Sequence, residues 1–357
     1  MQKGFTPTMT KGAPSYANLS RTVETTAYGL PDVVFRDYDI RGHAKTEINE
    51  EFALRLGGAL AFIFTQDNHR SVYVGRDCRL SSPEVTAALV QGLIKAGIDV
   101  IELGMVTTAT LNYAVYHGGR ASCGIMVTAS HNPKDYNGFK IIVRGQVMAG
   151  ETLQRIKSRM EKSLIHTDKQ AKVDSQTVTS DYLQQIVASC RVNPGFKIVI
   201  DAGNGSAGPV AVKLFEHLGC SVVPLYCEPD GNFPNHDPNP SDEVNLQKLI
   251  EAVVSTESDI GFALDGDGDR LVVITGKGDI IWPDRLMMIF AKDILQRHSG
   301  AKIVFDVKSS DRLDRLIRQH GGIPVMCKTG HAHVRTAVKE SSAALGGEFS
   351  GHIFFND

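Results

Sequence analysis

Two short segments of the chain carry side chains whose types and spacing could do chemistry. The first is TASHNP, residues 128–133, where Ser130 and His131 follow an apolar run and Lys140 lies a few residues further on. The second is DGDGDR, residues 265–270, in which three carboxylates alternate with glycine. A serine hydroxyl near clustered carboxylates could carry a phosphoryl group beside a divalent metal ion.

The carboxylates of DGDGDR predict a metal site. Asp265, Asp267 and Asp269 would repel one another unless a cation lay among them, and glycine lets the backbone curl so that alternate side chains converge. Hard oxygen ligands suit Mg²⁺, which also accepts phosphate oxygens. An EF-hand calcium loop would need flanking helices and a later glutamate, whereas strand-like segments surround this loop. The alternative is a solvated Asp-Gly turn. Arg270 would suit a phosphate.

Ser130 by itself allows two interpretations. A serine before His-Asn-Pro could reflect only turn chemistry. It does not lie in the G-x-S-x-G elbow of the α/β-hydrolases. Beside a metal ion, the hydroxyl could carry a phosphoryl group, and His131 and Lys140 could then move protons or hold the group in place.

A strand–helix–strand–helix–strand pattern recurs three times along the chain. It predicts an α/β fold of three consecutive related units with mixed, mainly parallel sheets, the third unit being incomplete. One of its helices is expected from Pro83 to Gly97, with Ser82 as N-cap. The predicted divisions are a flexible leader at 1–30 and units at 31–175, 176–278 and 279–357.

Ligands of such sheets gather at the carboxyl ends of the strands, so the polar residues there are further candidates. The loop GEFSGH, residues 347–352, follows the third strand of the third unit and could bind vicinal hydroxyls. Arg41, in FRDYDIRG, could hold a phosphate through two hydrogen bonds, or could instead pair with a neighbouring aspartate. The alternative for the loop residues is that they are ordinary polar side chains in a solvent-exposed loop. The candidates at these strand ends are Lys308, His331, Glu348, Ser350 and His352, whereas Arg41 lies before the first repeat.

The segment GNGSAG, residues 203–208, supports a rival function. It matches G-x-G-x-x-G between a predicted strand and helix, and Glu228 follows about twenty residues later, as in dinucleotide-binding folds. An NAD-linked dehydrogenase is therefore an alternative. Against it, the equivalent loops of the other two units lack the pattern, and it leaves DGDGDR unexplained.

Composition limits the other classes of function. The formal net charge is −2 and no long basic run occurs, which argues against nucleic-acid binding. No apolar stretch is long enough to span a membrane. The six cysteines form no C-x-x-C pair, which favours a reduced, cytoplasmic setting.

Taken together, the motifs resemble the α-D-phosphohexomutase family. The resemblance runs from about Val33 to the last residue and includes YNGFK, in the form typical of the bacterial mannose- and glucose-phosphate mutases. The motifs that carry it are FRDYDIRG, TASHNP, YNGFK, DGNFPNHDPNP, DGDGDR and GEFSGH.

The resemblance implies a phosphoserine mechanism on phosphorylated hexoses. Ser130 would exchange its phosphoryl group with a hexose 1- or 6-phosphate through a hexose 1,6-bisphosphate, which is both intermediate and activator. The three aspartates and phosphorylated Ser130 would bind Mg²⁺. The implied catalytic group is Ser130, His131, Lys140, Arg270 and Arg41. The implied substrate-binding group is Tyr38, Lys308, His331, Glu348, Ser350 and His352.

Members of the family also have a fourth domain, whose loop binds the non-reacting phosphate. We expect this chain to lack that domain and to turn over slowly or not at all, because remote phosphate binding contributes to catalysis. The family is expected to be monomeric, whereas exposed apolar surface on this chain could promote association. A non-catalytic sugar-phosphate-binding fragment is the remaining alternative.

Overall fold

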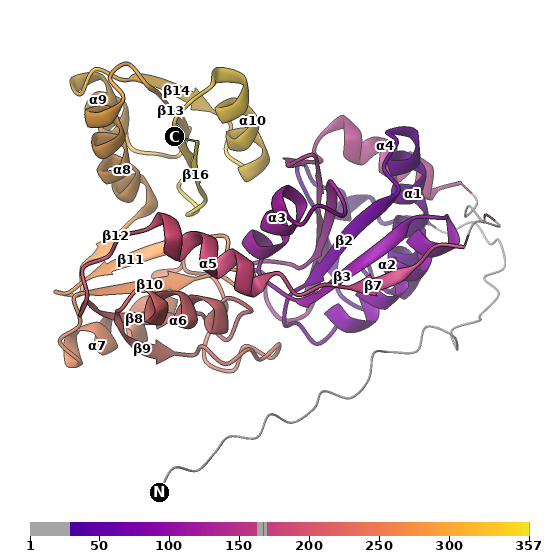
Figure 1. Cartoon of the computed structure of the whole chain (residues 1–357), viewed down its shortest axis with the longest axis horizontal. Coiled ribbons are helices and arrows are strands. Elements are labelled where there is room, and N and C mark those ends of the chain that lie inside the picture. Colours follow the sequence, from indigo (N-terminus) through magenta and orange to yellow (C-terminus); the bar gives the residue numbers. More distant parts are fainter. Residues whose placement is uncertain (1–28, 163–166, 168–169, 357) are drawn as a thin grey trace, which may run out of the picture.

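The computed structural model describes residues 29–162, 167 and 170–356 and contains three β-sheets along the chain (Figure 1). The predicted α/β fold with mixed, mainly parallel sheets is confirmed. The predicted leader lies outside the described residues, apart from Gly29 and Leu30. The unit boundaries at residues 175 and 278 stay predictions.

The first sheet has the strand order β1-β5-β4-β2-β3-β7, with β6 beside β5. Its strands are β1 (Ile40–His43), β2 (Ser71–Arg76), β3 (Asp99–Met105), β4 (Cys123–Val127), β5 (Tyr136–Val143), β6 (Gln146–Val147) and β7 (Val173–Ser175). The helices of this part are η2 (Asp32–Val34), α1 (Glu50–Gln66), α2 (Ser82–Lys95), α3 (Thr108–His117) and α4 (Glu151–Met160).

The second sheet has the order β12-β11-β10-β8-β9 and the third the order β14-β13-β15-β16. The second is built with α5 (Thr179–Ser189), β8 (Lys197–Asp201), α6 (Gly208–His217), β9 (Ser221–Leu225), η3 (Glu243–Leu246), α7 (Gln247–Ser255), β10 (Ile260–Leu264), β11 (Leu271–Thr275) and β12 (Ile280–Ile281). The third is built with α8 (Pro283–Arg297), β13 (Lys302–Asp306), α9 (Asp311–Gln319), β14 (Ile323–Cys327), α10 (His331–Ser341), β15 (Leu345–Gly347) and β16 (Ile353–Phe355).

All three sheets share one arrangement around their third predicted strand. β4, β10 and β15 each pair in parallel with the first strand of the repeated pattern, which is β2, β8 or β13. On the other side each pairs in antiparallel with the strand that follows it in the chain, β5, β11 or β16. The loops carrying TASHNP, DGDGDR and GEFSGH therefore occupy equivalent places, between this third strand of the repeat and its antiparallel neighbour.

The structure corrects the predicted start of α2. Ser82 is the first residue of the helix and Ser81 is its N-cap, without a side-chain hydrogen bond to the helix. The Ser82 hydroxyl instead donates to Asp77 Oδ1 at 2.6 Å. Capping was predicted because serine is a common N-cap, but a buried carboxylate nearby competes for the same hydroxyl.

The core of the first unit depends on a close crossing of α1 and α2. A Cβ added at Gly57 would lie 2.3 Å from the Leu89 carbonyl oxygen, and one at Gly92 would lie 2.1 Å from that of Leu54. The two glycines allow this approach, and fully buried side chains such as Phe52 and Leu93 then fill the space around it.

Two observations bear on the setting of the chain. All six cysteines are free thiols. Within the described part of the chain, no helix combines the length and the apolar character needed to cross a bilayer.

Gly57→Ala should lower the free energy of unfolding by about 1–3 kcal/mol, because the new methyl group would force the backbones of α1 and α2 apart. Urea denaturation would measure the loss. Gly29→Ala is the control, since a Cβ there meets nothing within 4 Å. An unchanged midpoint for Gly57→Ala would contradict the close crossing.

Candidate functional site

The three equivalent loops meet at one place and are joined by hydrogen bonds. The Ser130 hydroxyl, after β4, donates to Asp265 Oδ2 at 2.6 Å, in the loop after β10. His352, in the loop between β15 and β16, places its Nε2 3.0 Å from Asp269 Oδ1. The structure thus brings the hydroxyl, the carboxylates and the third loop together, although they lie far apart in the sequence.

Ser130 is held in an unusual backbone conformation. Its φ is +53°, a region that non-glycine residues rarely adopt, and the residue is only 1% exposed. The Ser130 amide donates to Thr128 Oγ1 at 2.8 Å. Its Oγ also lies 3.3 Å from His131 Nδ1. Strain of this kind concentrates at functional sites, where neighbouring contacts maintain it.

The aspartates form a compact cluster that fits a hard cation. Asp265, Asp267 and Asp269 can each offer one oxygen such that all three lie within 4.8 Å of one another. Burial, followed by the charges of Asp267 and Asp269, raises the pKa of Asp265 to about 7. Asp267 Oδ1 is buried without a hydrogen-bond partner. Crowded carboxylates with an unused oxygen are suitable ligands for Mg²⁺.

Lys140 neutralises part of this charge from β5. Its Nζ donates to Asp267 Oδ2 at 2.6 Å and to Asp269 Oδ2 at 2.5 Å. Burial alone would lower the pKa of Lys140, but the carboxylates of Asp267 and Asp269 outweigh it and leave the pKa raised. The side chain is therefore an ammonium ion and a hydrogen-bond donor.

The third loop is a chain of charged and polar groups. Glu348 Oε1 accepts from the Ser350 hydroxyl and lies 2.5 Å from His352 Nδ1. Burial by itself lowers the pKa of His352, but Asp269 and Glu348 raise it to about 9. Burial raises the pKa of Glu348, yet the bonds from His352 and Ser350 lower it to about 2. His352 therefore carries a positive charge between two carboxylates.

Several nitrogen donors around the cluster have no hydrogen-bond partner. Arg41 donates from its two Nη atoms to Asn132 and Asp39. Arg41 Nε and His331 Nε2 are buried without a hydrogen-bond partner, as is Arg270 Nε, which lies 3.8 Å from Asp265 Oδ2 as an ion pair. Burial, with the charges of Arg270 and Arg41, lowers the pKa of His131 to about 2, so its imidazole is neutral. Unpaired buried donors are costly, and an anion such as a phosphate would satisfy them.

Of the remaining predicted site residues that the structure describes, Tyr38 and His331 pack close to the cluster, whereas Lys308 does not contact it through a hydrogen bond or an ion pair. The Tyr38 ring packs edge-on against His331, with centroids 5.1 Å apart, and the His331 ring lies 5.2 Å from that of His352. Lys308 follows β13 and is exposed; among the described residues it forms no hydrogen bond or ion pair. No hydrogen bond or ion pair among the described residues therefore links Lys308 to the cluster.

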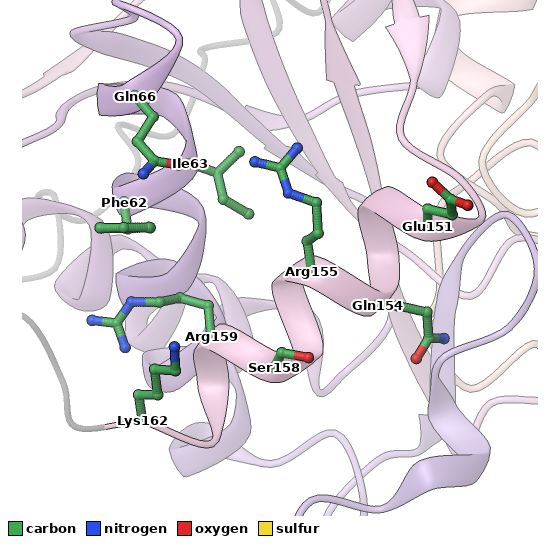
Figure 2. A pocket seen from close by; sticks show the side chains of 9 residues that line it. All are labelled: Phe62, Ile63, Gln66, Glu151, Gln154, Arg155, Ser158, Arg159 and Lys162. Atoms are coloured by element: carbon green, nitrogen blue, oxygen red, sulfur yellow. The ribbon is translucent and has the colours of Figure 1, made fainter.

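A cavity of about 370 Å³ opens beside these groups. Its lining includes Lys140, Asp269, His331 and His352, together with Thr108 from the start of α3. A separate hollow of about 370 Å³ lies on the surface between α1 and α4, lined by Phe62, Arg155, Arg159 and other residues drawn in Figure 2. None of the predicted site residues lines this second hollow.

Sequence reasoning missed Thr108 and Arg79. The Thr108 hydroxyl donates to Asp267 Oδ2 at 2.6 Å. Thr108 follows the second strand of the first unit, so the rule that identified His331 after β14 could have found it. Arg79 is fully buried below the Ser130 loop and hydrogen-bonds to its carbonyls. An arginine in a polar stretch carried no signal of burial.

The GNGSAG loop is filled by protein where a dinucleotide would need space. A Cβ at Gly205 would lie 2.8 Å from Gly266 Cα, and one at Gly208 would lie 2.0 Å from the Cys227 carbonyl oxygen. The glycines thus let this loop pack against the aspartate loop and against the end of β9. The dehydrogenase alternative finds no support in this geometry.

Comparison with known proteins yields one consistent family. Three domain models of phosphoglucomutase/phosphomannomutase, the α/β/α domains I, II and III, match residues 32–165, 180–278 and 282–357. A phosphomannomutase/phosphoglucomutase of Pseudomonas aeruginosa is 47% identical over 330 residues, covering 92% of this chain and 70% of that protein. A phosphoglucomutase of Neisseria gonorrhoeae is 44% identical over 325 residues, covering 91% of this chain and 70% of that protein.

A solved structure agrees with the sequence relatives. The crystal structure of a phosphoglucomutase/phosphomannomutase family protein from Burkholderia thailandensis superposes with a TM-score of 0.88 at 42% identity. It covers 92% of this chain, which spans 73% of that one. With its three matched domains and these relatives, the chain belongs to the phosphoglucomutase/phosphomannomutase family.

Proposed function

We propose that the chain is a phosphohexomutase that interconverts hexose 6-phosphate and hexose 1-phosphate, with mannose or glucose as the sugar. The observation that carries the proposal is the hydrogen bond from Ser130 Oγ to Asp265, beside a cluster of buried nitrogen donors without partners. Phosphoryl transfer requires a hydroxyl, a site for a cation and hydrogen-bond donors that can bind a phosphate, all in one cleft. The membership of the family supports the same reaction.

In the proposed reaction, the bond between Ser130 Oγ and phosphorus breaks while a sugar hydroxyl bonds to the same phosphorus. Asp265, Asp267 and Asp269 would hold Mg²⁺, which when bound would draw negative charge from the phosphoryl oxygens. The sugar hydroxyl loses its proton as it bonds to phosphorus, and Ser130 Oγ gains a proton as its bond to phosphorus breaks; charged Lys140 is the proposed donor. When a phosphoryl group returns to Ser130, the hydroxyl loses its proton again, and the neutral His131 ring, 3.3 Å from Ser130 Oγ, is the proposed acceptor. Arg41 and Arg270 hold the phosphoryl group.

Both phosphates must take turns at Ser130, so the sugar must bind in two orientations. A hexose 1,6-bisphosphate is then the intermediate, and added bisphosphate would regenerate phosphorylated Ser130. Glu348 and Ser350 can bind neighbouring sugar hydroxyls, and Tyr38, His331 and His352 line the same side. Lys308 is proposed for the same wall, on its position at the end of β13 alone. Cytoplasmic location and a monomeric state stay predictions.

Ser130→Ala should abolish conversion, lowering the rate by at least on the order of 10³-fold, because the covalent route is lost. The measurement is ³¹P NMR of mannose 1-phosphate and glucose 1-phosphate with Mg²⁺ and glucose 1,6-bisphosphate. Intact mass would report phosphorylation of the protein by the bisphosphate. Ser189→Ala, at the exposed end of α5, is the control. A wild-type protein that neither converts substrate nor accepts a phosphoryl group would refute the proposal.

Lys140→Met should lower the free energy of unfolding by about 3–5 kcal/mol in a chelator, because it leaves buried Asp267 and partly buried Asp269 without their ammonium partner. Mg²⁺ should stabilise this variant more than the wild type, since the ion supplies the missing positive charge. Urea denaturation with and without Mg²⁺ tests both statements, with Lys134→Met on the exposed loop as control. Equal stability of Lys140→Met and wild type in chelator would contradict them.

A further inference from the structure

Every N–H donor of the Arg79 guanidinium has a partner, either in the loop that carries Ser130 or in Asp77. Its Nη2 donates to the carbonyl oxygens of Ser130 at 2.8 Å and Asn132 at 2.6 Å. Its Nη1 donates to those of Pro133 at 2.6 Å and Tyr136 at 3.1 Å. Four carbonyls of one short loop thus point at one cation, whose side chain is 0% exposed. Only the fork of an arginine offers so many fixed donors.

A second connection reaches the same loop from its other side. The Arg79 Nε donates to Asp77 Oδ2 at 3.0 Å, and that oxygen also accepts from the Thr128 hydroxyl at 2.7 Å. Thr128 Oγ1 in turn accepts from the Ser130 amide at 2.8 Å. The amide and the carbonyl of Ser130 are therefore both held, by Thr128 and Arg79 respectively.

Arg79 also lies where the second unit touches the first. Its guanidinium carbon is 5.1 Å from the centre of the Phe233 ring. A Cβ at Gly231 would lie 2.5 Å from the Cys78 carbonyl oxygen, and the Cys78 thiol donates to the Asn204 carbonyl. The residue that holds the Ser130 loop is thus packed against the unit that carries the aspartates.

From these contacts we propose that Arg79 is the positioning residue of the site, acting with Asp77 and Thr128. It keeps Ser130 at its positive φ and keeps the Ser130 hydroxyl directed at Asp265. Arg79 makes no contact with the reacting atoms in this arrangement; it acts through the backbone of Ser130. The kinetic consequence rests on the function proposed above, whereas the effect on the loop does not.

The test compares Arg79→Lys with Arg55→Lys, a buried arginine on α1 that pairs with Glu51. Hydrogen exchange followed by mass spectrometry would report on the peptide spanning residues 128–138. Arg79→Lys should raise its exchange rate by on the order of tenfold relative to other peptides of the first unit. Exchange in that peptide equal to that of Arg55→Lys, or a uniform rise across the unit, would overturn the proposal.

The second readout is phosphorylation of Ser130 by glucose 1,6-bisphosphate, followed by intact mass. Arg79→Lys should slow it by on the order of 10²-fold at saturating bisphosphate with little change in the concentration needed for half saturation, because orientation is lost. Slowing that merely matches the unfolded fraction would count against the proposal. If wild type accepts no phosphoryl group, the proposed function fails, and the exchange result still decides the role of Arg79.

Thr128 provides a second test should Arg79→Lys fold poorly. Thr128→Ala removes the link between Asp77 and the Ser130 amide, whereas Thr128→Ser keeps the hydroxyl. We expect faster exchange in residues 128–138 for the alanine variant and recovery for the serine variant. Equal exchange rates in the two variants would overturn the proposal that Arg79, Asp77 and Thr128 together position Ser130.

Discussion

Crowding of three carboxylates in one loop, two of them fully buried, is the constraint on which the rest of the site depends. Asp265 and Asp267 are 0% exposed and lie within reach of a common ion. Isolated carboxylates are not stable in such a place unless other charges and donors compensate them. The partners come from elsewhere: Ser130 and Lys140 from the first unit and His352 from the third. The cluster is therefore also a junction that the three units build together.

The repeated architecture explains how one cleft gathers different chemistry. Each unit contributes the loop between the third strand of its repeat, β4, β10 or β15, and the antiparallel strand beside it. Equivalent loops with different residues supply a serine hydroxyl, a carboxylate cluster and a linked Glu-Ser-His group. In the proposed function these would act as nucleophile, cation site and sugar-binding groups. Glycine makes the approach possible, since a Cβ at Gly266 would lie 2.5 Å from the Ser130 carbonyl oxygen.

The site has one part in which the hydrogen-bonding groups of the Ser130 backbone have partners and another in which buried nitrogens have no hydrogen-bond partner. Around Ser130, the backbone is fully committed to Arg79 and Thr128. In Arg41 and His331, buried nitrogens lack hydrogen-bond partners, at a cost of about 1–3 kcal/mol for each such group, and Arg270 Nε has only an ion pair with Asp265 at 3.8 Å. A rigid nucleophile beside preorganised, unpaired donors suits the binding of a doubly charged group in the transition state.

Short segments of the sequence by themselves determined much of the fold and many of the candidate site residues. The β-branched runs ending in Asp, the glycines after helices and the DGDGDR and TASHNP segments specify strands, turns and candidate chemistry through near neighbours in the chain. Those signals predicted the α/β repeats and several of the residues that meet at the cleft, although Lys308, also predicted, makes no hydrogen bond or ion pair to the cluster among the described residues. Tertiary structure alone decided the role of Arg79, because its burial and its partners more than 40 residues away cannot be read from the residues beside it in the chain. It also decided that the Ser82 hydroxyl bonds to buried Asp77 and does not cap α2. It also filled the GNGSAG loop with protein, since a glycine allows close approach without specifying whether a ligand or a backbone will approach.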